Sequence, residues 1–172
     1  MSKNFSLIID LERCLYHRSC EVACQQENNL PLSIKWMRVV VAGPEEIDGK
    51  LKMTFPHIRC RHCGKPPCMD ACPTKAIKKR NDGIVVIDSE LCIGCKECIE
   101  ACPFGVPQFD PEREVVSMCN LCMHRLDQGL LPACVEHCPT QAIKLGDIND
   151  LTLEKERTRE LINLRNLADT EE

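Results

Sequence analysis

Fifteen cysteines mark the 172-residue sequence, and they fall into four groups. The third group has the spacing C-x2-C-x2-C-x3-C-P, which is the bacterial signature for [4Fe–4S] clusters. In such a run the first three thiols ligate one cluster and the fourth ligates a neighbouring cluster, so two runs exchange their last cysteines. The groups are Cys14, Cys20 and Cys24; Cys60, Cys63, Cys68 and Cys72; Cys92, Cys95, Cys98 and Cys102; and Cys119, Cys122, Cys134 and Cys138. The spacing therefore predicts iron–sulfur chemistry.

The four groups are related in pairs. The segments IIDLERC at 8–14 and VIDSELC at 86–92 share an Ile-Asp pair that is followed by a glutamate and then the first cysteine. The segments CPTKAI at 72–77 and CPTQAI at 138–143 differ at one position. Groups one and three are therefore related, as are groups two and four, which indicates that one small unit was used twice.

Two other uses of cysteine fit the sequence less well. The N-terminus has no apolar run suited to a signal peptide, so we expect thiols that stay reduced, and an odd number cannot pair fully within the chain. Structural zinc is typically held by two separated C-x2-C pairs, whereas group three places four cysteines within 11 residues. Zinc also leaves unexplained the proline that follows three of the groups.

Composition limits the remaining possibilities. Only six residues are Phe, Trp or Tyr, so apolar burial alone would stabilise this chain poorly. The net charge of −4 argues against nucleic acid as the main partner. No stretch has the length of a membrane-spanning helix, and we expect a cytoplasmic protein without direct membrane insertion. The sequence has no nucleotide fingerprint and no catalytic constellation, which predicts electron transfer rather than catalysis.

Short elements are expected around the cysteines. The β-branched runs FSLIID and GIVVID predict strands, and WMRVVVAG and KLKMTF predict a hairpin with PEEIDG as its connection. CIEACP and CMDACP suit single helical turns that end at the proline. Leucines at helical spacing predict a C-terminal helix, which either packs on its own module or docks on a larger subunit.

Longer motifs carry a resemblance to a known family. HCGKPPCMDACPTKAI, CIGCKECIEACPFGVP and CNLCMHRLDQGLLPACVEHCPTQAI resemble the four-cluster iron–sulfur subunits of molybdopterin and tungstopterin oxidoreductases. These include subunits of the formate dehydrogenase, dimethyl sulfoxide reductase, tungsten aldehyde oxidoreductase and benzoyl-coenzyme A reductase types. The resemblance covers about residues 5–145. It implies an α+β fold of two intertwined bacterial-ferredoxin-like modules at 1–148, with an inserted hairpin at about 35–57 and a C-terminal helix and tail at 149–172.

The resemblance also implies a function and partners. Such a subunit is non-catalytic and relays single electrons through [4Fe–4S] clusters between a molybdenum- or tungsten-pterin catalytic subunit and an external donor or acceptor of ferredoxin or flavin type. The alternative is a free-standing soluble polyferredoxin that diffuses between several enzymes. The chain's stability and oligomeric state with and without a partner would distinguish the two.

The ligand sets follow from the same resemblance. Cluster A is assigned to Cys60, Cys63, Cys68 and Cys102, and cluster B to Cys92, Cys95, Cys98 and Cys72. Cluster C is assigned to Cys119, Cys122, Cys134 and Cys24, and cluster D to Cys14, His17, Cys20 and Cys138.

His17 stands where the family has a cysteine. Imidazole ligates iron in Rieske centres, so His17 can be the fourth ligand of cluster D. Alternatively, three thiolates hold a three-iron cluster, or the cluster is absent and the thiols are ordinary small core residues. Group one departs from the pattern a second time, because Gln25 stands where the other groups have proline.

Overall fold

The computed structural model describes residues 4–47 and 49–147, and in this part of the chain short strands alternate with short helices. The architecture is α+β, as the sequence predicts. The elements are β1 (Phe5–Ile9), α1 (Ser19–Glu27), β2 (Met37–Val39), β3 (Ala42–Ile47), β4 (Lys50–Thr54), β5 (His57–Arg59), α2 (Pro67–Asp70), β6 (Ile77–Lys79), β7 (Val85–Ile87), α3 (Glu97–Glu100), β8 (Gln108–Asp110), β9 (Val115–Ser117), α4 (Met123–Leu126), α5 (Ala133–Glu136) and β10 (Ile143–Asp147).

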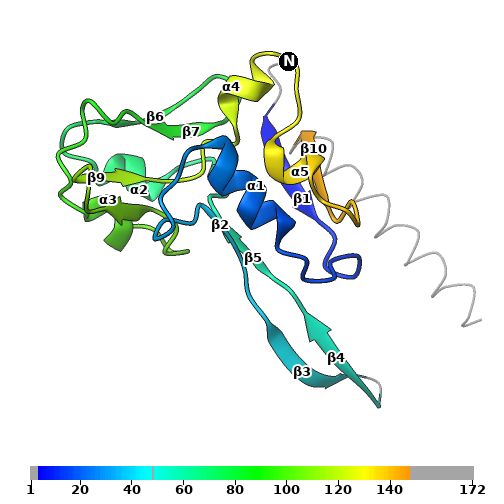
Figure 1. The fold of residues 1–172 in the computed structure, drawn as a ribbon. Helices are drawn as coiled ribbons and strands as arrows, with labels where there is room; N and C mark the ends of the chain where they lie inside the picture. Colours follow the sequence, from blue (N-terminus) through cyan, green and yellow to red (C-terminus); the bar gives the residue numbers. More distant parts are fainter. Residues whose placement is uncertain (1–3, 48, 148–172) are drawn as a thin grey trace, which may run out of the picture.

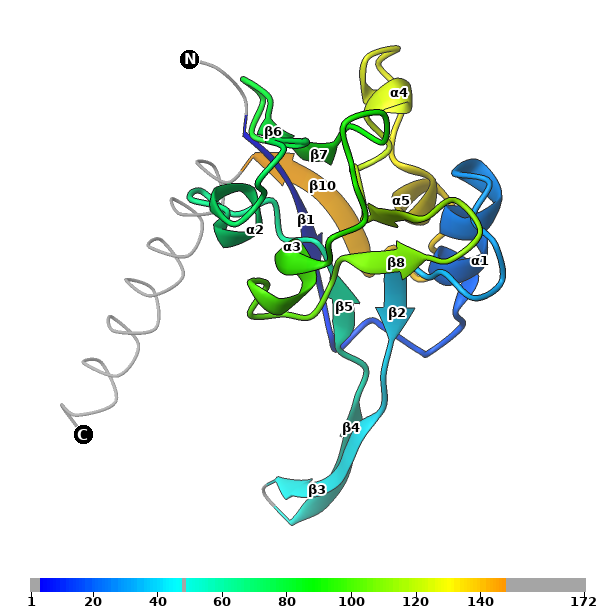
Figure 2. The same ribbon diagram turned by 90° about the vertical axis from the view of Figure 1, so that its left-hand side faces the viewer.

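The strands form antiparallel pairs that divide the molecule into two halves (Figure 1). β1 pairs with β10, so that Phe5 lies opposite Asp147 and Ile9 lies opposite Ile143. α1 packs against α5 beside this pair. The middle of the chain forms the other half, in which β6 pairs with β7, β8 pairs with β9, and α2 packs against α3. One half therefore combines the beginning and the end of the described chain, and β1 lies beside β10 in Figure 2. The other half is formed by the continuous middle of the chain.

Each half has its own buried core, and cysteines make up much of both cores. One core contains Leu7, Cys20, Cys24, Met37, Val39, Ile84, Leu121, Cys134 and Ile143. The other contains Cys60, Cys68, Ile77, Val85, Cys98, Val106, Val116, Met118 and Cys119. Trp36 packs against both cores and joins them. Thiols therefore occupy interior positions that larger apolar side chains would fill in an ordinary domain of this size.

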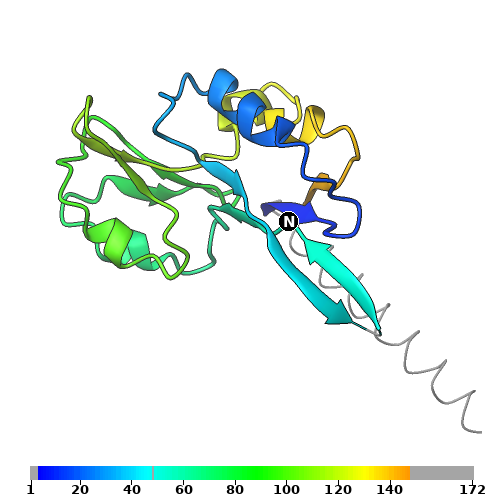
Figure 3. The ribbon, with the colours of Figure 1, turned by 60° about the horizontal axis from the view of Figure 1, so that its bottom comes forward.

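A two-stranded arm leaves the body of the molecule (Figure 3). β2 pairs with β5 at its base, and β3 pairs with β4 further out. The sequence places Pro44, Glu45 and Glu46 in the connection, whereas the structure includes all three in β3. The reason is an irregularity between Ala42 and Glu45, because a bulge lets a strand accommodate a proline without ending.

The helices differ in length for a reason visible in the sequence. α2 and α3 have four residues each, and a Cys-Pro pair follows both after one further residue. α1 has nine residues, because Gln25 takes the place of that proline and the helix continues to Glu27. The Gln25 amide then donates to the carbonyls of Pro31 and Ile34, at 3.5 and 3.2 Å. The C-terminal helix expected at 149–172 lies outside the described residues.

Candidate metal centres

Two cavities in the middle half are each lined by four cysteines. Cys60, Cys63, Cys68 and Cys102 line one of them, and Cys72, Cys92, Cys95 and Cys98 line the other. These are the residues assigned to clusters A and B. In both cavities three thiols come from one loop and short helix, and the fourth comes from the segment after the other helix. The packing of α2 against α3 brings the exchanged cysteine within reach in each case.

The other half gathers two further sets of thiols. Cys24 on α1 lies among Cys119, Cys122 and Cys134, close enough for their charges to interact, and these four residues are the set assigned to cluster C. Cys20, one helical turn before Cys24, lies near Cys14 and Cys138, which are the other two thiols assigned to cluster D. The contact between α1 and α5 positions both sets.

All fifteen cysteines are free thiols, and burial makes most of them poor acids in the absence of a cation. Burial raises the pKa of Cys20, Cys98 and Cys119 to about 11 and that of Cys60 to about 12. Burial also raises the pKa of Cys24 and Cys134 further, and the neighbouring thiols add to the rise. A buried thiolate is costly unless a positive group compensates its charge, and iron supplies such a charge. The donor set therefore suits cationic metal centres.

The thiols line the walls of cavities and do not converge on a point. Within residues 4–47 and 49–147, no group of three or more His, Cys, Asp or Glu side chains is placed to hold a single metal ion. In an iron–sulfur cube each thiolate binds a different iron atom at a different corner, so the sulfurs remain apart. Four thiols around a cavity match that requirement.

Backbone amides approach the first sulfur of three groups. The N–H of His62 donates to Cys60 Sγ, that of Val116 to Cys92 Sγ, and that of Leu121 to Cys119 Sγ, each at 3.4 Å. The Cys-Pro-Thr segments add hydroxyls, with Thr74 Oγ1 lying 3.6 Å from Cys72 Sγ and Thr140 Oγ1 3.6 Å from Cys138 Sγ. Hydrogen bonds to cluster sulfurs are one of the factors that set a reduction potential.

The loop of group one follows the backbone course of the loop of group three. Tyr16 and Gly94, each two residues after the first cysteine, have φ of 59° and 67°. Arg18 and Lys96, four residues after it, have φ of 56° and 67° and precede a helix in both loops. Position 94 requires glycine, because a Cβ atom there would lie 2.4 Å from the Glu114 carbonyl oxygen.

Position 17 is equivalent to position 95 in these two loops. The side chains of His17 and Cys95 are both exposed. The neighbouring Tyr16 ring stacks on Phe55, with ring centroids 5.1 Å apart, and the Arg18 guanidinium lies 4.5 Å from the centroid of the Tyr16 ring. The histidine thus lies at the position equivalent to Cys95, in a loop that contacts the base of the hairpin arm through Tyr16 and Phe55.

Two polar residues near the thiols had no signal in the cysteine spacing. The Asn28 amide lies 3.8 Å from both Cys24 Sγ and Cys122 Sγ, and it also donates to the Cys24 carbonyl at 2.9 Å. Arg59 directly precedes Cys60 and donates to the carbonyls of Cys60 and Leu7, at 2.9 and 2.5 Å. Nothing in the sequence singles out Asn28, since its position depends on the extension of α1. Only its place next to a ligand could have drawn attention to Arg59.

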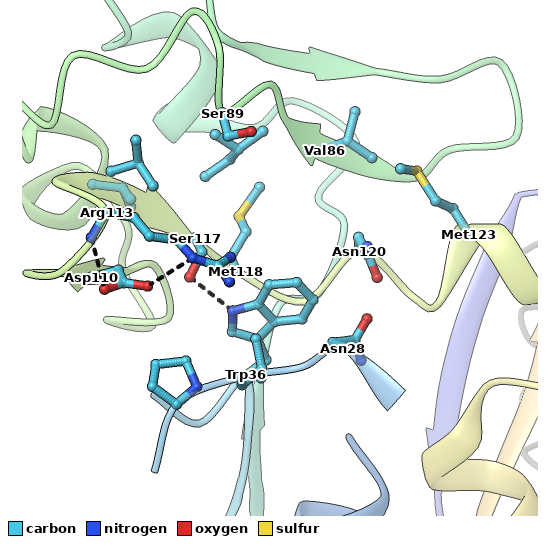
Figure 4. A pocket seen from close by; sticks show the side chains of 15 residues that line it. Asn28, Trp36, Val86, Ser89, Asp110, Arg113, Ser117, Met118, Asn120 and Met123 are labelled. Atoms are coloured by element: carbon cyan, nitrogen blue, oxygen red, sulfur yellow. Dashed lines mark hydrogen bonds and ion pairs between the residues drawn. The ribbon is translucent and has the colours of Figure 1, made fainter. Parts of the chain in front are cut away.

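A further pocket lies between the halves and has no cysteine in its lining (Figure 4). Trp36 lies in it beside Met118, and its indole N–H donates to Ser117 Oγ at 3.0 Å. Asp110 at its edge accepts from the backbone N–H of Glu112 and of Arg113 and pairs with the Arg113 side chain. The polar groups of Trp36 and Asp110 thus have hydrogen-bond or ion-pair partners within the protein. We therefore assign the pocket to the packing between the two halves.

Comparisons with known proteins agree with this geometry. Residues 51–148 match the model of the 4Fe-4S dicluster domain. The chain is 40% identical to a tetrathionate reductase subunit of Salmonella typhimurium and 40% identical to a polysulfide reductase subunit of Wolinella succinogenes, covering 85% and 87% of this chain. It is 35% identical, over 90% of its length, to the thiosulfate reductase electron transfer subunit of Salmonella typhi. The chain spans 59%, 80% and 82% of these three relatives.

The relatives correct one expectation. A cytoplasmic location was predicted, and it is wrong, because relatives such as the tetrathionate reductase and polysulfide reductase subunits are peripheral members of membrane-associated complexes. In the part of the chain that the structure describes, no helix combines the length and the apolar character needed to cross a bilayer. The absence of a membrane-spanning helix does not determine location, because partner subunits can hold a peripheral subunit at a membrane.

Proposed function

Because this chain belongs to the 4Fe-4S dicluster family of iron–sulfur subunits, we propose that it relays electrons between a molybdenum- or tungsten-pterin catalytic subunit and an external redox partner. Subunits of this family transfer electrons and do not carry the catalytic reaction. Four-thiol cavities are the observation that supports the proposal most directly. The relatives are subunits of reductases, which favours a complex over the freely diffusing polyferredoxin.

We assign cluster A to Cys60, Cys63, Cys68 and Cys102, and cluster B to Cys92, Cys95, Cys98 and Cys72. Cluster C takes Cys119, Cys122, Cys134 and Cys24. The two halves are then two ferredoxin-like modules at 1–148, the hairpin arm at about 35–57 is an insertion, and each module holds two clusters by exchanging cysteines between its loops. When bound, the clusters supply one-electron chemistry, while the protein sets their spacing and potential.

His17 completes cluster D with Cys14, Cys20 and Cys138. The equivalent backbone of the loops at 14–20 and 92–98 supports this assignment, because it places His17 at the register of Cys95. A neutral imidazole in place of a thiolate leaves the site one charge less negative, and lower negative charge favours reduction. The three-iron cluster and the empty loop are the alternatives that the experiment below distinguishes.

The four sets are arranged in a line. Cys98 of set B is near Cys68 of set A, and Cys60 of set A is near Cys119 of set C. Cys134 of set C is in turn near Cys20 of set D. Electrons therefore pass in the order B, A, C, D or its reverse. Clusters B and D lie at the ends, where the catalytic subunit and an external donor or acceptor of ferredoxin or flavin type would dock.

Iron and acid-labile sulfide per chain, with low-temperature EPR, test the proposal. Four cubane clusters require about sixteen iron atoms per chain, a three-iron cluster D requires about fifteen, and an empty cluster D loop requires about twelve. A colourless, iron-free protein that remains folded would refute the function altogether. Co-purification with a pterin-containing subunit tests the partner separately.

A further inference from the structure

Arg59 carries a positive charge into the space between the two halves. It lies on β5 opposite Met37 of β2, and Met37 is 1% exposed. One terminal nitrogen donates to the Cys60 carbonyl at 2.9 Å and the other to the Leu7 carbonyl at 2.5 Å. Its Nε is buried and has no hydrogen-bond partner among the described residues. The guanidinium is therefore held by two backbone contacts that do not neutralise its charge.

The hydrogen bond to Leu7 brings the guanidinium to the buried core that contains Cys24 and Cys134, two thiols assigned to cluster C. Leu7, which accepts one of its hydrogen bonds, belongs to the same buried core as Cys134. Burial raises the pKa of both Cys119 and Cys134, and the positive charge of Arg59 opposes the rise in each case. The pKa of Arg59 itself is lowered by burial, while the nearby Cys119 and Cys134 oppose that change. These opposed effects agree with the hydrogen bond to Leu7, which brings the cation to the core that contains Cys134.

The duplicated sequence supplies a natural comparison for this residue. Arg59 precedes Cys60, the first cysteine of group two, and Met118 precedes Cys119, the first cysteine of the related group four. Met118 is 4% exposed and lines the cavity of cluster A. At equivalent positions, then, the residue before the first ligand reaches the other group's cluster. The residue at this position is the neutral Met118 beside cluster A. It is the cationic Arg59 on the side of cluster C.

We propose that Arg59 is a tuning residue which raises the reduction potential of cluster C, the cluster that links the two halves. The inference rests on the proposed function, since it requires a cluster held by Cys24, Cys119, Cys122 and Cys134. Reduction adds one negative charge to a cluster, and a fixed cation beside it in a partly dry interior stabilises the reduced form. Arg59 thereby favours residence of the electron at cluster C, one of the two inner positions in the order B, A, C, D.

The test is an EPR-monitored redox titration of the full-length holoprotein, purified anaerobically in complex with its partner subunit. Arg59→Gln removes the charge and Arg59→Lys keeps it, and Arg59→Met, which copies position 118, is a second neutral variant. Arg38→Gln is the matched control, because Arg38 lies on the paired strand β2 but is exposed. Asn28→Ala identifies the signal of cluster C, since it removes a donor 3.8 Å from Cys24 Sγ and Cys122 Sγ.

We expect a neutral variant to lower the midpoint potential of one cluster signal, the same signal that Asn28→Ala shifts. Arg59→Lys should leave that potential near its wild-type value, and Arg38→Gln should leave all signals unchanged. An equal shift in Arg59→Lys and Arg59→Gln would mean that the hydrogen bonds act rather than the charge, and it would overturn the inference. So would unchanged potentials, or a shift of another signal, in a neutral variant with wild-type iron content. A wild-type chain without iron would instead refute the proposed function.

Discussion

Groups one and three share a backbone loop that carries different side chains. Both loops have positive φ at the second and fourth residues after the first cysteine, and both lead into a helix that carries a buried cysteine. They differ at the exposed residue three positions after the first cysteine, which is His17 in one and Cys95 in the other. They also differ after the last cysteine, where Gln25 replaces Pro103. The two copies thus differ at this exposed position and directly after the last cysteine, while both keep the buried thiol on the helix.

The largest effect is expected from a buried ligand of the unaltered loop. Cys98 is 6% exposed, belongs to a buried core and lines the cavity of cluster B. Cys98→Ser should lose about four iron atoms per chain and destabilise the middle half, because the cluster also fills the interior there. Iron analysis and thermal unfolding measure the two effects. Cys95→Ser is the comparison, since Cys95 is exposed, and it should lose less iron. Equal losses would mean that burial of a ligand does not govern cluster retention.

A reciprocal exchange sharpens the comparison at the exposed position. His17→Cys adds a thiolate to cluster D and should lower its midpoint potential, whereas Cys95→His removes one from cluster B and should raise that potential. The physical reason is the change of one unit of charge at the cluster. Redox titration followed by EPR measures both, and nitrogen hyperfine coupling from the wild-type chain, lost in His17→Cys, identifies the imidazole ligand. Unchanged potentials in His17→Cys with unchanged iron would show that His17 is not a ligand.

The third prediction concerns Gln25, the residue that follows the last cysteine of group one. Gln25→Pro should end α1 near Cys24 and remove the two hydrogen bonds from Gln25 to the carbonyls of Pro31 and Ile34. A proline inside a helix costs about 3 kcal/mol in the free energy of unfolding. Denaturant unfolding of the holoprotein measures the loss, and Gln25→Ala, which keeps the helix but removes the amide, separates the two contributions. A Gln25→Pro variant as stable as the wild type would show that the longer helix contributes nothing to the fold.

Much of the site follows from the sequence because cysteine spacing is a local property. A loop of C-x2-C-x2-C has few ways to wrap one cluster, so the spacing predicts which cysteines form a group without knowledge of the fold, whereas the pairing of the groups rests on the family resemblance. The strands at FSLIID and GIVVID were likewise local and are present as β1 and β7. In contrast, the extent of β3 depended on a bulge around Pro44, which propensity alone does not reveal.

Arg59 and Asn28 show what local patterns cannot supply. Arg59 meets the carbonyl of Leu7, in the core that contains Cys134, only after the two halves have packed together, across a sequence separation that no short motif spans. Asn28 meets Cys122 only because α1 continues past Cys24. A sequence reveals which atoms hold a cluster more readily than it reveals which charges surround it. Reduction potentials depend on those surroundings, so they remain beyond prediction from spacing.

The smallest predicted effect also concerns the extended α1, at its last residue. Glu27 receives hydrogen bonds from His124 and Arg125, at 2.7 and 2.8 Å, which join α1 to α4. The hydrogen bond from His124, together with the hydrogen bond and charge of Arg125, holds the pKa of Glu27 below its ordinary value against the opposing effect of burial. A carboxyl group with a lowered pKa in the folded state stabilises the protein above its unfolded pKa. That stabilisation is lost as the pH falls through the pKa of Glu27 in the folded state.

Glu27→Gln should therefore lower the free energy of unfolding by about 0.5 kcal/mol at neutral pH, the scale of a partly exposed ion pair. The difference from wild type should shrink as the pH is lowered through the acidic range in which Glu27 becomes protonated. Unfolding measured across that range at fixed ionic strength provides the test, and Glu136→Gln is a matched control, because Glu136 pairs with the same Arg125 but belongs to α5 rather than to α1. A difference that stays constant with pH would mean that the carboxylate charge of Glu27 does not contribute. The advantage of the longer helix would then come from Gln25 alone.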